Sequence, residues 1–164
     1  MRRLSLILLS LLLIGGVREK SDLSPITRSG AFFWQIHKTG KVLRSKDKGK
    51  TWQEQNLSDA LYRDLYFLDS LHGWLVGERD ERGIILHTTD GGETWVNQSP
   101  PPPTPASEPV SYLKVHFANR RYGMILAEKG YLLATYDGGI TWSWKFAGEN
   151  AESLWNTWSQ MKKR

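Results

Sequence analysis

Three aspartates, Asp47, Asp90 and Asp137, each stand in a glycine-rich stretch where a carboxylate can bind a cation or hold a turn. Calcium takes about six to eight oxygen ligands, and each stretch offers one acid at its centre. A short aspartate side chain instead accepts hydrogen bonds from backbone N–H groups a few residues ahead. We therefore expect loop stabilisation, and predict no metal and no cofactor. The histidines also lack metal-ligand spacing: His37, His72, His87 and His116.

The residues around these aspartates repeat one pattern, Ser/Thr-x-Asp-x-Gly-x-Thr-Trp. The aspartates are 43 and 47 residues apart, close to the period of a four-stranded propeller blade. The glycine permits a positive φ, and the tryptophan is a large apolar side chain to bury where one blade meets the next. The pattern predicts structural roles for Ser45, Asp47, Gly49, Thr51, Trp52, Thr88, Asp90, Gly92, Thr94, Trp95, Thr135, Asp137, Gly139, Thr141 and Trp142.

Alternation of apolar residues and turn residues predicts four strands in each repeat. In the second unit we expect strands near 61–68, 73–79, 83–89 and 94–98, and in the third near 111–118, 122–128, 130–136 and 141–146. The first unit has a second strand at 31–37, but Pro25 interrupts the region before it. Eight Trp, fifteen Gly and seven Pro also favour short strands and tight turns. The predicted fold is all-β.

The repeat domain is expected over 22–148, in units of about 22–57, 58–99 and 110–148, with a proline-rich linker at 99–109. Residues 1–17 carry paired arginines and then an apolar run, which is typical of a signal peptide or an N-terminal anchor. The protein is therefore expected outside the cytoplasm: periplasmic, secreted or tethered to the outer side of the membrane.

An amphipathic helix is predicted over 149–164, with Asn150 as its N-cap. Leu154, Trp158 and Met161 would form its apolar face. The pattern leaves two roles open. The helix either caps the last blade or docks on a partner or an anionic membrane surface.

Composition excludes several classes of site. The absence of cysteine excludes disulfides, thiolate metal sites and lipid attachment to cysteine. The net charge of +5 is mild, and the Lys and Arg residues are scattered except at the C-terminus, so no nucleic-acid groove is indicated.

The boxes and the strands between them resemble the Asp-box (bacterial neuraminidase repeat) superfamily. They are most similar to its photosystem II stability/assembly-factor type. The resemblance implies β-propeller-type blades and a non-enzymatic scaffold that binds a protein during assembly of a complex. Propellers typically need four to eight blades, and this chain supplies about three. We therefore expect an open or incomplete propeller, completed by a homo-oligomer or by a partner.

The superfamily also includes sialidases, so a carbohydrate-binding or sialidase-like module is the alternative. That chemistry needs arginines, a tyrosine with its glutamate and an acid/base aspartate around one centre. The available residue types do not form such a constellation in sequence: Tyr62, Arg63, Glu78, Arg79, Arg82, Arg120 and Arg121. We predict no enzyme. The candidate binding surface comprises Trp34, Trp74, Glu78, Arg120, Arg121, Tyr122 and Glu128, with Trp34, Trp74 and Tyr122 expected to be exposed.

Overall fold

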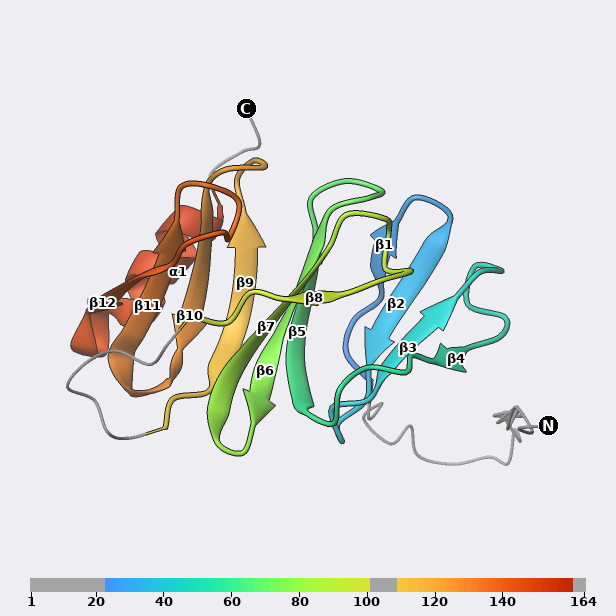
Figure 1. Ribbon diagram of the computed structural model, residues 1–164, viewed down its shortest axis with the longest axis horizontal. Coiled ribbons are helices and arrows are strands. Elements are labelled where there is room, and N and C mark those ends of the chain that lie inside the picture. The colour runs from blue at the N-terminus through green and yellow to red at the C-terminus, as the bar shows by residue number, and fades with distance from the viewer. Residues whose placement is uncertain (1–22, 101–108, 161–164) are drawn as a thin grey trace, which may run out of the picture.

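Three four-stranded antiparallel sheets stand side by side in the computed structural model, which describes residues 23–100 and 109–160 (Figure 1). We call them blades 1 to 3. Blade 1 holds β1 (Thr27–Ser29), β2 (Phe32–Ile36), β3 (Val42–Ser45) and β4 (Gln53–Glu54). Blade 2 holds β5 (Leu61–Phe67), β6 (Gly73–Arg79), β7 (Arg82–Thr88) and β8 (Val96–Asn97). Blade 3 holds β9 (Tyr112–Phe117), β10 (Gly123–Ala127), β11 (Tyr131–Thr135) and β12 (Ser143–Phe146). The predicted all-β fold of repeated blades is confirmed.

The chain runs through each sheet in sequence order, so neighbouring strands are joined by short turns. The first strands of successive blades, β1, β5 and β9, contact one another. The last strands, β4 and β8, have two residues each and are exposed. The central strand β6 is buried on both faces because blade 1 covers one face and blade 3 the other. Its Leu75 belongs to the apolar cluster between blades 1 and 2, and its Val76 to the cluster between blades 2 and 3.

The apolar interface between two neighbouring blades is called a joint below, and a tryptophan lies at the centre of each of the two joints. Trp34 packs against Phe67 and Trp95 of blade 2, with ring centroids 5.3 and 6.1 Å apart. Trp74 stacks on Phe117 of blade 3 at 3.5 Å between centroids. Their exposed fractions are 0% and 1%, so the expectation that Trp34 and Trp74 are exposed is wrong. Each lies on a strand face that the following blade covers.

The box tryptophans complete the same joints from the other side. Trp95 is half-buried against Trp34 and Phe67, and Trp142 is half-buried against Phe117. Trp52 occupies the equivalent place on blade 1, beside Phe33, where the described residues provide no preceding blade.

Blade 1 is more complete than its sequence suggests. Leu23 forms an isolated bridge with His37, the Ser24 N–H donates to the Ile36 carbonyl, and pairing resumes at β1. Pro25 falls between these contacts, where its missing N–H breaks the ladder without removing the strand.

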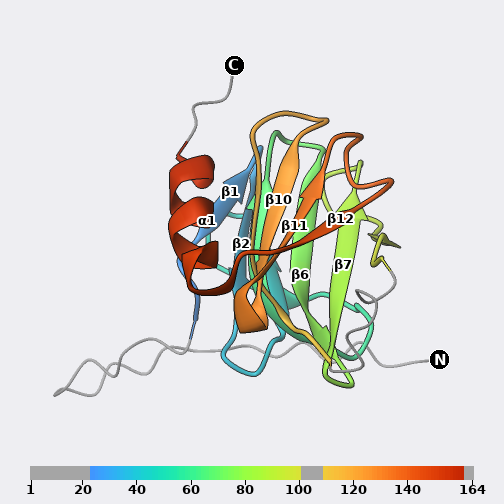
Figure 2. The same ribbon diagram turned by 90° about the vertical axis from the view of Figure 1, so that its left-hand side faces the viewer.

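The C-terminal helix α1 (Ala151–Ser159) covers the side of blade 3 that faces away from blade 2 (Figure 2). Trp155 and Ala151 are its buried residues, packed with Leu126 and Leu132, whereas Leu154 is 43% exposed. The predicted apolar face is therefore wrong for Leu154, whereas Trp158 is half-buried and meets the His116 ring of β9 edge to face at 5.5 Å. The helix caps the last blade. Asn150 makes no capping side-chain bond, because the 3-10 turn η2 (Gly148–Asn150) leads directly into α1.

Some predictions fall outside the described residues. These are the signal or anchor at 1–17, most of the linker at 99–109, and the end of the predicted helix, including Met161. None of the helices in the described ranges is long and apolar enough to cross a membrane.

Candidate functional site

The three Asp-boxes hold their loops with the same hydrogen bonds. In blade 2, the Thr94 hydroxyl donates to Asp90 Oδ2 at 2.6 Å and the Thr94 N–H donates to Oδ1 at 2.9 Å. The Thr88 hydroxyl donates to Asp90 and accepts the Gly92 N–H, each at 2.8 Å. Asp47 and Asp137 repeat this arrangement. The carboxylates are occupied by loop donors, as predicted, and no group of three acids or histidines that could hold a metal occurs in the described ranges.

These bonds make a pH dependence of stability predictable. The threonine hydroxyl, and then the threonine N–H, lower the pKa of Asp47, Asp90 and Asp137 to about 2. A carboxyl whose folded-state pKa is depressed contributes stability above its unfolded pKa of about 3.9, and loses it as the pH falls through the folded value. We expect the urea midpoint to fall between about pH 4 and pH 2. The Asp90→Asn variant should show a shallower fall, and an identical slope in both proteins would contradict the prediction.

The β5–β6 and β9–β10 turns lie at the same edge of the molecule as the boxes. The Gly91 N–H donates to the Leu71 carbonyl and the Gly138 N–H to the Arg121 carbonyl, each at 2.9 Å. Both glycines have positive φ, and a Cβ on either would lie 2.7 Å from a carbonyl oxygen of the neighbouring turn. The second and third boxes therefore each fix the turn beside them. We call this side of the molecule the loop edge.

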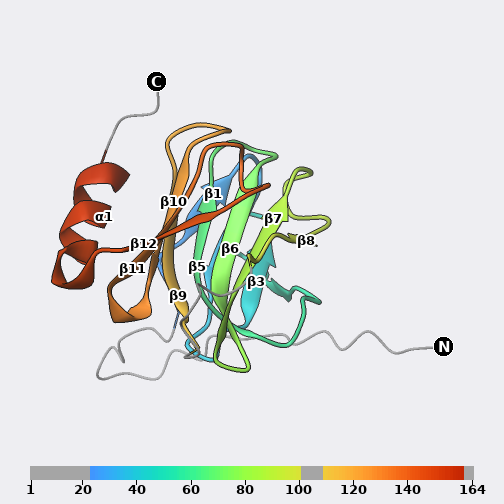
Figure 3. The same cartoon turned by 60° about the vertical axis from the view of Figure 1, so that its left-hand side comes forward.

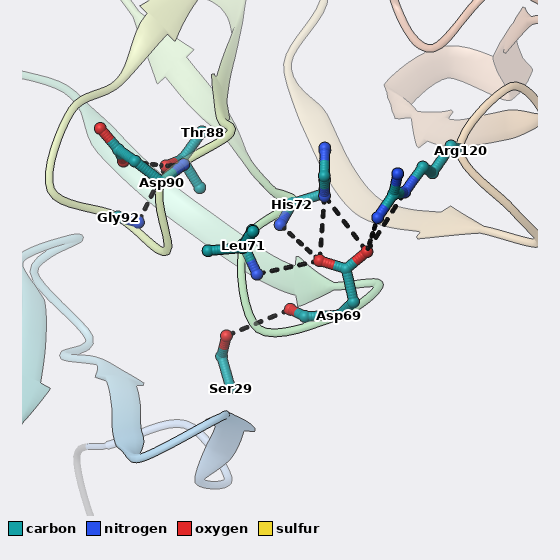
Figure 4. A network of polar contacts seen from close by, with 8 residues as sticks. All are labelled: Ser29, Asp69, Leu71, His72, Thr88, Asp90, Gly92 and Arg120. Carbon is teal, nitrogen blue, oxygen red and sulfur yellow. Dashed lines mark hydrogen bonds and ion pairs between the residues drawn. The ribbon is translucent and has the colours of Figure 1, made fainter.

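Asp69 links the three blades at the loop edge (Figure 4). Its carboxylate accepts the N–H groups of Leu71 and His72, the His72 ring, and the Arg120 guanidinium of blade 3 at 3.2 Å. Its carbonyl accepts the Ser29 hydroxyl of blade 1. Partial burial opposes ionisation, but these hydrogen bonds outweigh it and hold the pKa of Asp69 well below its usual range. This network keeps the turns of adjacent blades in a fixed relation.

An apolar and cationic patch is presented on this edge. The Tyr122 and Tyr136 rings meet edge to face at 5.9 Å, and the Arg121 guanidinium lies 5.8 Å from the Tyr122 ring centre. Arg121 Nε also donates to the Tyr136 carbonyl. Exposed aromatic residues beside arginine are typical of protein interfaces. We define the loop-edge patch as Leu71, Arg120, Arg121, Tyr122, Tyr136 and Ile140, all of which are exposed.

The predicted surface residues are thus divided by the structure. Arg120, Arg121 and Tyr122 lie together on the loop-edge patch, and Tyr122 is exposed as expected. Glu78 lies in the joint between blades 2 and 3, where it pairs with Arg63 at 2.9 Å and accepts the Ser111 hydroxyl. Glu128 begins the 3-10 turn η1 (Glu128–Gly130), remote from the patch.

The surface predicted from the sequence did not include Leu71, Tyr136 and Ile140. Two of them can be recognised from the sequence. Tyr136 and Ile140 occupy variable box positions that are polar in the other two boxes.

The residue types considered for sialidase chemistry do not converge. Tyr62 is buried with its hydroxyl on Ser58, and Arg63 is paired with Glu78. Arg79 and Arg82 lie at the tip of the β6–β7 hairpin, opposite the loop edge that carries Arg120 and Arg121 (Figure 3).

Three Asp-box blades with hydrogen-bonded turns along one edge define a protein of the β-propeller type. The sequence profile of photosynthesis system II assembly factor YCF48 matches residues 57–145, and the chain belongs to this family.

Individual relatives cover parts of the chain. The photosystem II assembly lipoprotein Ycf48 of Picosynechococcus sp. is 43% identical over 49 residues, which is 29% of this chain and 14% of the relative. A solved structure of YCF48 from Cyanidioschyzon merolae superposes with a TM-score of 0.64 at 22% identity, over 84% of this chain and 44% of that one. YCF48 bound to a D1 peptide superposes at 0.57 and 24% identity, over 76% and 39%. At these identities the structural likeness concerns the fold. The chain thus spans less than half of each of these relatives. Its family favours the assembly-factor interpretation over the sialidase-like alternative.

Proposed function

We propose that this chain is a non-enzymatic assembly factor that binds a segment of a photosystem II subunit, the D1 protein, through its loop-edge patch. The main support is the loop-edge patch, an exposed surface of aromatic and arginine side chains on turns that the boxes hold in place. A structurally similar YCF48 is described as bound to a D1 peptide, which gives the proposal its partner.

The geometry suits capture of a peptide segment. The Asp69 network and the two glycine N–H bonds fix the turns before a partner arrives, so little conformational freedom is lost on binding. Tyr122, Tyr136 and Ile140 offer apolar contact area, and the Arg121 guanidinium offers N–H donors to carboxylates or peptide carbonyls.

We further propose that the protein is exported, with residues 1–17 as signal or membrane anchor. The cyanobacterial relative is named a lipoprotein, which supports a place at a membrane. Because this chain lacks cysteine, the apolar segment itself would supply any tether. A second copy or a partner would complete the propeller beside blade 1, since α1 covers the far side of blade 3.

Binding of a synthetic D1 peptide to the full chain tests the proposed function. The double variant Tyr122→Ala/Tyr136→Ala should bind the peptide about tenfold more weakly or worse, because interface aromatics carry much of the binding energy. Phe146→Ala is the control, since it removes a 67% exposed aromatic away from the patch. Calorimetric titration measures both. Equal affinities for the unchanged protein and the double variant would exclude the patch as the binding site.

A further inference from the structure

The β6–β7 hairpin places two arginines opposite each other at its tip, with two acids in the turn between them. Arg79 and Arg82 are directly opposite each other in the strand register, and like charges in this position destabilise a sheet. The two residues between them, Asp80 and Glu81, have φ of 51° and 62°, a left-handed conformation that is costly for residues other than glycine. Within 23–100 and 109–160, no ion pair joins either arginine to an acid.

Both arginines line a groove of about 420 Å³, together with Asn97 and Ser99. A second groove of about 580 Å³ is also lined by Arg79 and Asn97, so the two grooves are adjacent. Among the described residues, Asp80 is the only acid that lines the smaller groove. Glu93 lines the larger one, and it is already paired with the buried Arg44 of blade 1 at 2.6 Å.

The groove offers mainly hydrogen-bond donors. The Asn97 side-chain oxygen accepts the Ser99 N–H at 2.7 Å, which leaves the Asn97 NH₂ group as donor. The Ser99 hydroxyl oxygen accepts the Ile85 N–H at 2.8 Å, which leaves its hydroxyl proton. Two guanidinium groups add further N–H donors suited to carboxylate or phosphate geometry.

We propose that this groove is an oxyanion-binding site, in which Arg79 and Arg82 hold a carboxylate or phosphate group and Asn97 and Ser99 donate to it. A bound anion offsets the charges of the two opposed guanidinium groups. The site lies at the opposite edge from the loop-edge patch and does not depend on the proposed function (Figure 3).

Titration of the full chain with inorganic phosphate and with acetate, at constant ionic strength set by chloride, tests the site. One of the two anions should bind and raise the melting temperature above that in chloride alone. The variant Arg79→Gln/Arg82→Gln should bind that anion about tenfold more weakly or worse, because charge-assisted hydrogen bonds are lost. Its melting temperature without ligand should be unchanged or higher, because the repulsion is gone. The anion that binds more tightly shows whether the site prefers a phosphate or a carboxylate group.

The matched control is Lys48→Gln/Lys50→Gln, which removes the same charge from exposed positions of the first box and should retain anion binding. Failure of both anions to bind the unchanged protein would overturn the proposal. An equal loss in the two double variants would also overturn it, because net charge alone would then account for the binding.

Discussion

Replacing Trp74 with alanine is expected to lower the free energy of unfolding by about 3 to 5 kcal/mol, as large truncations in a packed core do. The side chain is 1% exposed and lies between the rings of Phe117 and His87, both of which it stacks on. Its removal opens a cavity in the joint between blades 2 and 3. Urea denaturation followed by fluorescence measures the loss.

Trp52→Ala provides the matched comparison, because this box tryptophan lies on the side of blade 1 that no described blade covers. Its loss should cost at least about 1 kcal/mol less than the loss of Trp74. If the two variants lost similar amounts of unfolding free energy, burial in the joint between blades would not explain the contribution of Trp74.

Trp155→Ala is expected to have the second largest effect, about 3 kcal/mol, since it removes the main buried side chain of α1. Blade 3 would then expose Leu126 and Leu132, the apolar residues that the helix covers. Loss of helical circular dichroism should accompany a lower melting temperature.

Leu154→Ala is the control for this helix, because Leu154 is adjacent in sequence and 43% exposed. It should change stability by no more than about 0.5 kcal/mol. If Leu154 proved the more sensitive position, the helix would dock through the opposite face and would not cap blade 3.

The repeat explains why most of the fold is predictable from sequence. Each box requires a particular aspartate, glycine and threonine to close its loop, so the loops and the strands beside them appear directly in the residue pattern. The strand expected at 73–79 is β6, with the same bounds.

The burial of Trp34 and Trp74 was not predictable in the same way. Alternation in a strand identifies two faces, but it does not say which of them another blade covers. In β6 both faces of the strand are covered by other blades, so its buried residues do not alternate with exposed ones. The buried face of the helix was also not predictable. Trp155 and Leu154 are both apolar, and only the contact with blade 3 shows that Trp155 is the buried one.

The loop-edge patch was partly predictable. Arg120, Arg121 and Tyr122 are adjacent in sequence and stand in a turn, where exposed charge and aromatic groups are visible. Tyr136 joins them only because the third box folds back onto that turn through Gly138. Such proximity depends on tertiary hydrogen bonds, which no local pattern records.

The most direct test of binding at the loop edge is hydrogen exchange of the full chain with and without the D1 peptide. If the peptide binds the loop-edge patch, backbone amides in the turns at 68–72, 118–122 and 136–140 should exchange more slowly, with no change at the hairpin tip at 79–82. Slower exchange confined to the hairpin tip, or bound peptide with unchanged exchange at the three turns, would contradict binding at this patch.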